Sequence, residues 1–234
     1  MNHNSRNSKE AGFSLLELLI AMAITIGMLG IAATALTTGF RIRDREESVT
    51  DAIADAQRGL NIMSREIANA GFNLTTNGIV AGDSSSTSIR IRSNLNRWET
   101  GALDASRNGV IDEGEDLKFF VNAADGIDYL VRHDAFGETT VLANRMSQLR
   151  IHYFAEKVTY STPTASVGLS APSDCDISSP SASEVSPDAA GYIVIALCVR
   201  IAASGVAGTD GYQPASNVLL VSDVTLRNSN LTNY

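Results

Sequence analysis

A long apolar and uncharged run dominates the first part of the chain. Residues 1–12 are polar and include Arg6, Lys9 and Glu10, whereas residues 18–40 carry no charged side chain. A helix that crosses a bilayer needs about 20 apolar residues, whereas the apolar core of a secretory signal has about 7–15. The pattern therefore predicts a membrane-spanning helix. By hydropathy alone, an uncleaved single-span anchor fits as well as a cleaved precursor.

Beyond this run, small and apolar residues return every three or four positions, which is the spacing of one helix face. These residues are Ile42, Val49, Ile53, Ala56, Leu60, Met63, Ile67 and Ala70. Residues 1–70 contain no proline, so the pattern predicts one continuous helix from about Ser14 to about Ala70, with Gly71 as its C-cap. At 1.5 Å per residue it is about 85 Å long. One small domain cannot bury such a helix, so its first half needs lipid or other subunits.

After the helix, the apolar pattern changes to the alternation of β-strands. The predicted strands are residues 87–92, 127–133, 139–143, 148–154, 192–201 and 218–226, the second and third forming a hairpin around the turn at 134–137. Residues 161–191 are rich in Ser, Ala, Pro and Asp and are predicted to form a long exposed loop. A helix followed by strands predicts an α+β fold, in which an antiparallel β-sheet packs on the apolar face of the helix.

The composition narrows the function classes. With 44% hydrophobic and 19% charged side chains, the 234 residues fit one folded domain with an appendage. The formal net charge of −8 argues against a nucleic-acid-binding surface, so protein, lipid or cations are the expected partners. The three histidines, His3, His133 and His152, are scattered, and no catalytic motif is recognisable. The protein is therefore not expected to be an enzyme.

The chain has only two cysteines, Cys175 and Cys198, which is too few for a disulfide framework. Their spacing is not that of a zinc site. A disulfide in an oxidising compartment would pin the predicted loop to a strand, and two free thiols fit the sequence equally well.

Glu17 stands at the start of the apolar run, where an unpaired carboxylate in lipid costs on the order of a few kcal/mol. A cut between Gly12 and Phe13 would make Glu17 the fifth residue, close enough to attract the new amino group of its own or a neighbouring chain. Residues 12–20, GFSLLELLI, resemble the type III signal of prepilins. The resemblance implies cleavage after Gly12 by an inner-membrane prepilin peptidase, N-methylation of Phe13, and a role for Glu17 in assembly.

The same resemblance implies three segments. These are a cleaved leader at 1–12, a transmembrane and filament-core helix at 13–40, and a periplasmic or extracellular pilin head at 41–234. Residues 63–72, MSREIANAGF, resemble the end of the long helix in PilW-type minor pilins and in J-type minor pseudopilins of type II secretion. The likeness implies a low-abundance subunit that primes assembly or lies near the filament tip. Before assembly such a subunit is held in the bacterial inner membrane with its N-terminus in the cytoplasm.

Residues 104–115, DASRNGVIDEGE, match the twelve-residue calcium loop of an EF-hand. The predicted ligands are Asp104, Ser106, Asn108, the Val110 carbonyl, Asp112 and a bidentate Glu115. Hard oxygen ligands at this spacing suit Ca²⁺ better than a transition metal. The acidic residues Asp104, Asp112, Glu113, Glu115 and Asp116 are expected to repel one another unless a cation is present. A polar turn without an ion is the alternative.

Three hypotheses follow. The first is a structural minor pilin in a type IV pilus-like filament, whose partners are other pilins, prepilin peptidase and the inner-membrane assembly platform. The second is a minor pseudopilin of a type II secretion system. The third is a membrane-anchored, calcium-dependent binding module of the periplasm that never polymerises, and an uncut N-terminus would favour it.

Overall fold

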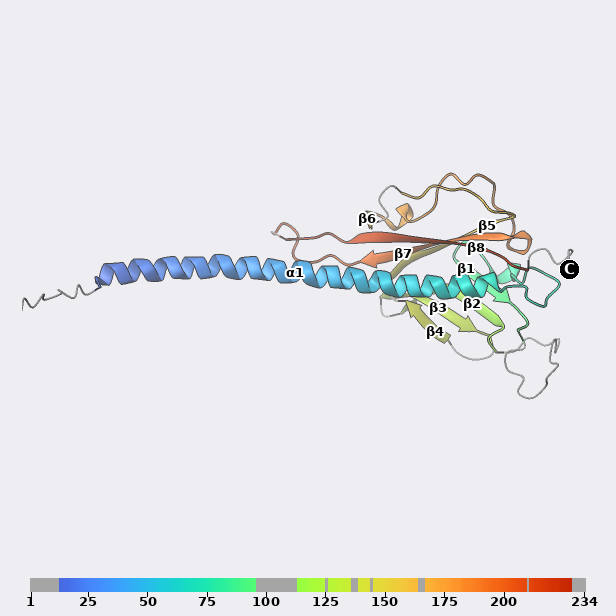
Figure 1. Ribbon diagram of the computed structural model, residues 1–234, viewed down its shortest axis with the longest axis horizontal. Coiled ribbons are helices and arrows are strands. Elements are labelled where there is room, and N and C mark those ends of the chain that lie inside the picture. Colours follow the sequence, from blue (N-terminus) through green and yellow to red (C-terminus); the bar gives the residue numbers. More distant parts are fainter. Residues whose placement is uncertain are drawn as a thin grey trace, which may run out of the picture.

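One long helix projects from a β-rich head in the computed structural model of the protein (Figure 1). The structure describes residues 13–95, 113–124, 126–135, 139–143, 145–163, 167–209 and 211–228. Helix α1 spans Leu15–Ala68, which is 54 residues, and the strands follow it in the chain. The predicted α+β architecture, a long N-terminal helix packed on antiparallel strands, is confirmed.

The C-terminal half of α1 is buried in the head through one face. Its buried residues recur at the predicted spacing and are Ala52, Ala56, Gly59, Leu60, Met63 and Ile67. Val49 and Ile53 are partly buried against the same core. Ile42, which the pattern assigned to this face, is instead 37% exposed, because the sheets of the head begin further along the helix. A Cβ at Gly59 would lie 3.0 Å from Leu130 Cδ2, so this glycine allows the helix to approach β3 closely.

The helix ends slightly before the predicted position. Its C-cap is Asn69, whose N–H donates back into the last helical turn. Gly71 follows with a φ of +75°, and a Cβ there would lie 2.6 Å from the carbonyl oxygen of Thr76. The Gly71 N–H donates to the carbonyl of Arg92 at 2.9 Å. Gly71 therefore turns the chain toward the first strand and is not itself the cap.

The head contains two four-stranded sheets, where the sequence predicted one. The first has the order β1-β2-β3-β4 and consists of β1 (Ser88–Arg92), β2 (Asp116–Ala124), β3 (Ile127–Asp134) and β4 (Thr139–Ala143). The second has the order β5-β7-β8-β6 and consists of β5 (Met146–Phe154), β6 (Val167–Leu169), β7 (Tyr192–Ile201) and β8 (Ser216–Thr225). Three 3-10 turns lie at Ala81–Asp83, Pro172–Asp174 and Pro187–Ala189. Every strand pairing is antiparallel.

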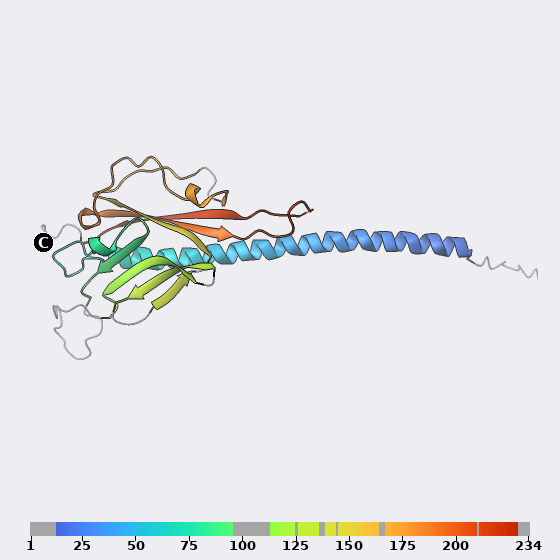
Figure 2. The same cartoon turned by 180° about the vertical axis from the view of Figure 1, so that it is seen from behind.

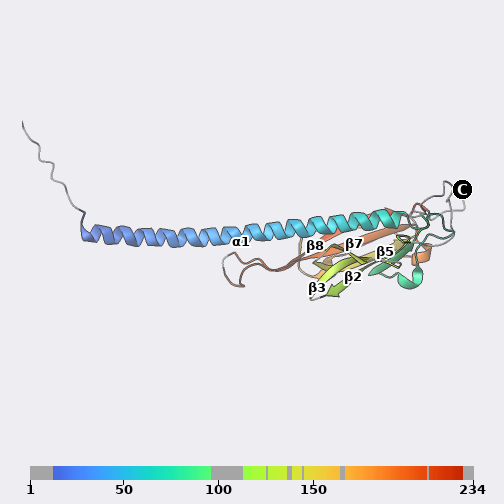
Figure 3. The ribbon, with the colours of Figure 1, turned by 90° about the horizontal axis from the view of Figure 1, so that it is seen from below.

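In Figure 1 the second sheet lies above α1 and strands β2, β3 and β4 of the first sheet lie below it, while Figure 3 shows that both sheets are on the same side of the helix. The same arrangement is seen from behind in Figure 2. Helix α1 packs against β4, β7 and β8, and β5 packs against strands of the first sheet. One continuous core results, which includes Met63 from the helix, Phe119 from the first sheet, and Ile151 and Ile195 from the second.

Most strands lie where the alternation predicted them. The hairpin of β3 and β4 is confirmed, with His133 opposite Thr139 in the register. Two strands were missed. Strand β2 begins at Asp116, which by its charge resembles the acids of the predicted calcium loop before it, although the residues that follow form a strand. Strand β6 has only three residues, which is too short for a periodic signal.

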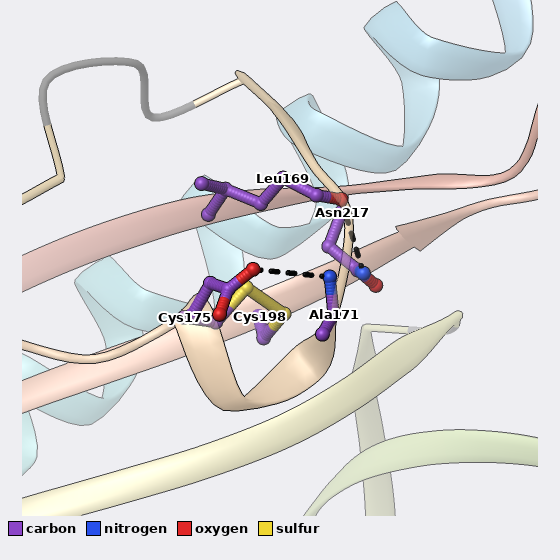
Figure 4. Close-up of a disulfide and its surroundings, with 6 residues drawn as sticks. Leu169, Ala171, Cys175, Cys198 and Asn217 are labelled. Atoms are coloured by element: carbon purple, nitrogen blue, oxygen red, sulfur yellow. Dashed lines mark hydrogen bonds between the residues drawn. A yellow bond between two sulfur atoms is a disulfide. The ribbon is translucent and has the colours of Figure 1, made fainter.

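The stretch 161–191, predicted to be an exposed loop, is tied to the second sheet. The structure joins Cys175 to Cys198 of β7 by a disulfide with a Cα–Cα distance of 5.5 Å, and both residues are buried (Figure 4). His152 of β5 adds two further contacts, from Nε2 to Asp176 Oδ1 at 2.7 Å and from Nδ1 to Glu184 Oε1 at 2.8 Å. The prediction of an exposed loop is therefore wrong around Cys175, because that side chain fills space beside β7.

Asp116, at the start of β2, is buried between two arginines of β1. Arg90 Nε and Nη2 donate to its two carboxylate oxygens at 2.7 and 2.9 Å, and Arg92 Nε donates at 2.8 Å. Burial alone raises the pKa of Asp116, but the hydrogen bonds from Arg90 and Arg92 outweigh it and hold the pKa below its usual range. At Asp116, one of the five acids expected to repel one another, the two guanidinium groups already supply the opposite charge.

We predict that Asp116→Asn lowers the free energy of unfolding by about 2–3 kcal/mol, because it removes charge-assisted hydrogen bonds to both arginines. A carboxyl group whose pKa is lowered by folding stabilises the fold above its unfolded pKa, here 3.8. That contribution is lost as pH falls through the folded pKa. Chemical denaturation measures the free energy of unfolding of both chains. The loss in Asp116→Asn relative to the wild type should have its whole size at about pH 7 and become smaller below about pH 4.

Asp51→Asn is the matched control, because Asp51 is exposed on α1. Its effect should stay within about 0.5 kcal/mol at every pH. An Asp116→Asn difference that is unchanged between neutral and acidic pH would contradict the proposed charge pairing.

Candidate functional site

The predicted cleavage point lies at the edge of the described residues. Gly12 is outside them, and Phe13 is 82% exposed at their start. Ser14 is the N-cap in an extended conformation with φ −74° and ψ 140°, and its carbonyl accepts the Leu18 N–H at 3.2 Å. Helix α1 therefore begins two residues after the predicted cut, with Phe13 outside the helix.

Glu17 lies in the first turn of α1 and is exposed. A negative charge at this end of a helix is stabilised by the helix dipole. Among the residues that the structure describes, no ion pair involves Glu17. The carboxylate stands one residue before the uncharged run, at the border of the apolar surface.

The N-terminal half of α1 extends beyond the sheets and is apolar on all sides (Figure 1). Its large side chains are each more than half exposed and are Leu15, Leu16, Leu18, Leu19, Ile20, Met22, Ile24, Ile26, Met28, Leu29, Ile31, Leu36 and Phe40. The hydroxyls of Thr25, Thr34, Thr37 and Thr38 donate to helix carbonyls three or four residues earlier, at 2.8–3.1 Å. These hydroxyl donors are therefore satisfied within the helix and do not need water as a hydrogen-bond partner. The apolar surface as a whole needs an apolar environment.

Within the described residues, α1 is the one helix long and apolar enough to cross a membrane. None of its most apolar window is buried in the head, so this part of α1 is not the core helix of a globular domain. The helix continues unbroken into its buried half, so the apolar segment is directly continuous with the part of α1 that packs in the head.

Arg45 fastens α1 to the loop between β7 and β8. Its guanidinium donates to the carbonyl oxygens of Ala202 at 2.9 Å, Gln213 at 3.1 Å and Pro214 at 2.7 Å. A planar fork of five N–H donors suits several acceptors in one loop. The role of Arg45 could not be predicted from the sequence, because these carbonyl partners lie more than 150 positions away and are backbone atoms with no side-chain signal.

The predicted calcium loop lies mostly outside the described residues, which exclude Asp104, Ser106, Asn108, Val110 and Asp112. Glu115 is described and is 1% exposed. Its Oε1 accepts the Leu95 N–H, and its backbone carbonyl accepts the Ser93 N–H at 2.9 Å. The described residues contain no cluster of three or more His, Cys, Asp or Glu side chains that would hold a metal. A calcium site would therefore depend on residues 104–112, with Glu115 anchored beside them.

The two described histidines lie in different surroundings. His133 Nδ1 is 2.9 Å from Thr139 Oγ1, beside an open groove of about 620 Å³ between the sheets that Lys118, Phe120 and Gln148 also line. His152 instead contacts the two carboxylates that hold the loop before β7. In the part of the chain that the structure describes, the hydrogen bonds of the two histidines go to Thr139, Asp176 and Glu184, and not to a serine or cysteine as in a pair of base and nucleophile.

A comparison with known families gives one match. The family model described as a prokaryotic N-terminal methylation motif matches residues 7–36, which include Gly12, Phe13, Glu17 and most of the apolar run. No curated protein and no solved structure matches the chain. The chain therefore carries a type IV prepilin-like signal, which together with its pilin-like α+β architecture supports a protein of the type IV pilin or pseudopilin class.

Proposed function

We propose that the protein is a structural minor subunit of a type IV pilus-like filament. In this role it is cleaved after Gly12 by prepilin peptidase, methylated at Phe13 and held in the inner membrane by residues 13–40 before assembly. It has no catalysis of its own and acts in assembly priming or at the filament tip, where its head is available for adhesion.

The observation that carries this proposal is the exposed apolar half of α1 directly after the methylation motif. Lipid covers this surface before assembly, and the helices of neighbouring subunits cover it in the filament. Lipid and neighbouring helices both cover a helix that is apolar on every side. The subunit can therefore pass from the membrane into the filament without refolding.

The same signal and fold also fit a minor pseudopilin of a type II secretion system. Filaments sheared from the cell surface and analysed for this chain distinguish the two machines. Recovery in surface pili supports the minor pilin, and a subunit that stays in the cell envelope supports the pseudopilin.

Replacing Gly12 by a bulky residue should block processing, because the peptidase must accept the residue before the cut. We expect Gly12→Leu to accumulate as the full precursor, whereas wild type loses residues 1–12 and gains one methyl group on Phe13. Intact-mass spectrometry of the membrane fraction measures both. The control is Ala11→Leu, which should still be cut. A Gly12→Leu chain that still gives the wild-type mature mass would contradict the requirement for Gly12, and a wild-type chain that keeps the mass of residues 1–12 would rule out cleavage at this site.

Glu17→Ala should be inserted and cut normally but enter filaments poorly. The carboxylate is tolerated in an apolar environment only where a protein amine compensates it, and its removal takes away that pairing. Asp44→Ala is the matched control, since Asp44 is an exposed acid of the same helix beyond the apolar run. The amount of each variant in sheared filaments is compared with the amount in membranes, and equal incorporation of Glu17→Ala and wild type would disprove the role.

We propose further that residues 104–115 bind Ca²⁺ and that the ion stabilises the head. At about 100 times Kd, an ion that binds only the folded state adds about 2.7 kcal/mol. Melting of the full chain in detergent should therefore shift upward by several degrees with calcium over chelator, and magnesium should substitute poorly.

The variants are chosen so that loss of binding is not confused with loss of folding. Glu115 is buried and accepts a backbone N–H, so its replacement destabilises the head with or without calcium. The test therefore uses Asp104→Asn with Asp112→Asn, which should abolish the calcium shift. Glu113→Gln, at a position that supplies no ligand in the predicted loop, should retain it. Equal melting temperatures of the wild type in calcium and chelator would mean that the loop is only a turn.

A further inference from the structure

The loop between β7 and β8, residues 202–215, reaches far along α1 toward its apolar end (Figure 3). Gly211 in this loop has a φ of +79°, and a Cβ there would lie 2.9 Å from Thr38 Cγ2. The end of the loop therefore lies directly against Thr38, which belongs to the uncharged run of residues 18–40. No other part of the described head is seen to reach as far toward the N-terminus of the helix.

The loop is bound to α1 at its base and is hydrogen-bonded within itself toward its end. Arg45 binds the carbonyls of Ala202, Gln213 and Pro214, and Ser204 and Gln213 exchange two backbone hydrogen bonds at 2.9 Å. Toward the end, the Thr209 N–H donates to the Val206 carbonyl at 3.1 Å, and the Tyr212 N–H donates to the Thr209 carbonyl at 3.1 Å. Arg45 at the base and the close approach of Gly211 to Thr38 together set the position of the loop along the helix axis.

That height coincides with the surface of a bilayer. The hydrocarbon core is about 30 Å thick, which corresponds to about 20 helical residues at 1.5 Å each. Counted from Leu18, the first residue after Glu17, the core ends near Thr37. The headgroup layer adds about 5–7 Å on each side, which is about four more residues. Thr38, and with it the end of the loop, therefore falls in the headgroup layer.

The side chains at this end suit that layer. Val206 is 65% exposed and Tyr212 is 37% exposed. Residues 202–215 contain no Lys or Arg and one acid, Asp210, which lies outside the described residues. Tyrosine is enriched at membrane interfaces, where its ring contacts apolar chains and its hydroxyl stays in water. Arg41 and Arg43, both exposed on the adjacent turn of α1, can reach lipid phosphates at the same level.

We propose that the end of the β7–β8 loop, with Val206 and Tyr212, is a lipid-binding surface that rests in the headgroup layer of the bilayer while the subunit is anchored. This contact holds the head against the membrane in one orientation, as a second point of attachment beside α1. The inference rests on the proposed membrane insertion of residues 13–40 and adds a site in the head to it.

The test places a fluorophore at the loop and measures its contact with lipid. The full chain carrying Val206→Cys, labelled under non-reducing conditions, is reconstituted in vesicles of phosphatidylethanolamine and phosphatidylglycerol that contain a lipid with a nitroxide on its headgroup. Val141→Cys is the matched control, because Val141 is also exposed and its neighbours Leu142 and Ala143 lie beside Gly59, about 30 Å further along the helix axis than Thr38. We expect severalfold stronger quenching at position 206 than at position 141.

A label at Leu29→Cys, in the middle of the apolar run, reports insertion separately through quenching by acyl-chain nitroxides. If this label is not quenched, the anchor and the present inference both fail. If it is quenched but positions 206 and 141 are quenched equally, only the inference fails. A label at position 206 that is shielded from aqueous iodide but unaffected by headgroup nitroxides would assign the surface to a protein partner and overturn the lipid contact.

A pair of glycine variants tests whether the approach to Thr38 sets the height. Gly211→Ala places a methyl group against Thr38, whereas Gly208→Ala adds one at a similar φ of +84° with nothing within 4 Å. Quenching of the label at position 206 should fall severalfold in Gly211→Ala and persist in Gly208→Ala. Equal quenching in both variants would show that the loop does not depend on this contact to reach the lipid.

Discussion

The burial of α1 is the constraint on which the rest of the structure depends. The helix has 54 residues, and only its C-terminal half finds apolar partners within the chain. The remaining surface, from Leu15 to Phe40, is apolar on every side and needs cover that the head does not supply. A helix of this kind fits two environments, lipid and the interior of a helical bundle, and the methylation motif at its start supports a type IV pilin-like chain, for which we propose both. The C-terminal half of α1 is therefore part of the core of the head, and the N-terminal half is not.

Both sheets of the head pack against one face of that half (Figure 3). The small residues Ala52, Ala56 and Gly59 let the sheets come close, while Leu60, Met63 and Ile67 fill the space between them. Polar contacts add specific links between the helix and the head. Arg132 of β3 pairs with Glu66 of the helix at 2.9 Å, and Arg45 holds the β7–β8 loop. The disulfide of Cys175 and Cys198 fastens the longest irregular stretch to the second sheet.

Much of this arrangement could be predicted from the sequence, because it rests on local patterns. The helix, the hairpin of β3 and β4, and β7 follow from periodicity, and the signal follows from residues 12–20. The second sheet, the arginine pair around Asp116 and the contacts of Arg45 could not be predicted, because they join residues that are far apart in the chain. Strand β2 was missed because Asp116 was grouped with the preceding acids by charge, although it begins a buried strand. Ile42 was misassigned because a helical period does not tell where along the helix the partner begins.

Helix α1 and strands β7 and β8 lie along the same axis, and this alignment has a mechanical consequence. Strands β7 and β8 run alongside the buried half of the helix, so a pull on the helix from its N-terminus loads their contact in shear (Figure 3). In shear, side-chain contacts along the whole overlap must yield together, whereas a peeling force would break them one after another. Arg45 is the first strong contact that such a load meets, and its three carbonyl partners pass the load to both ends of the β7–β8 loop. The disulfide closes the chain between Cys175 and Cys198, so that segment cannot lengthen even if the head begins to give way.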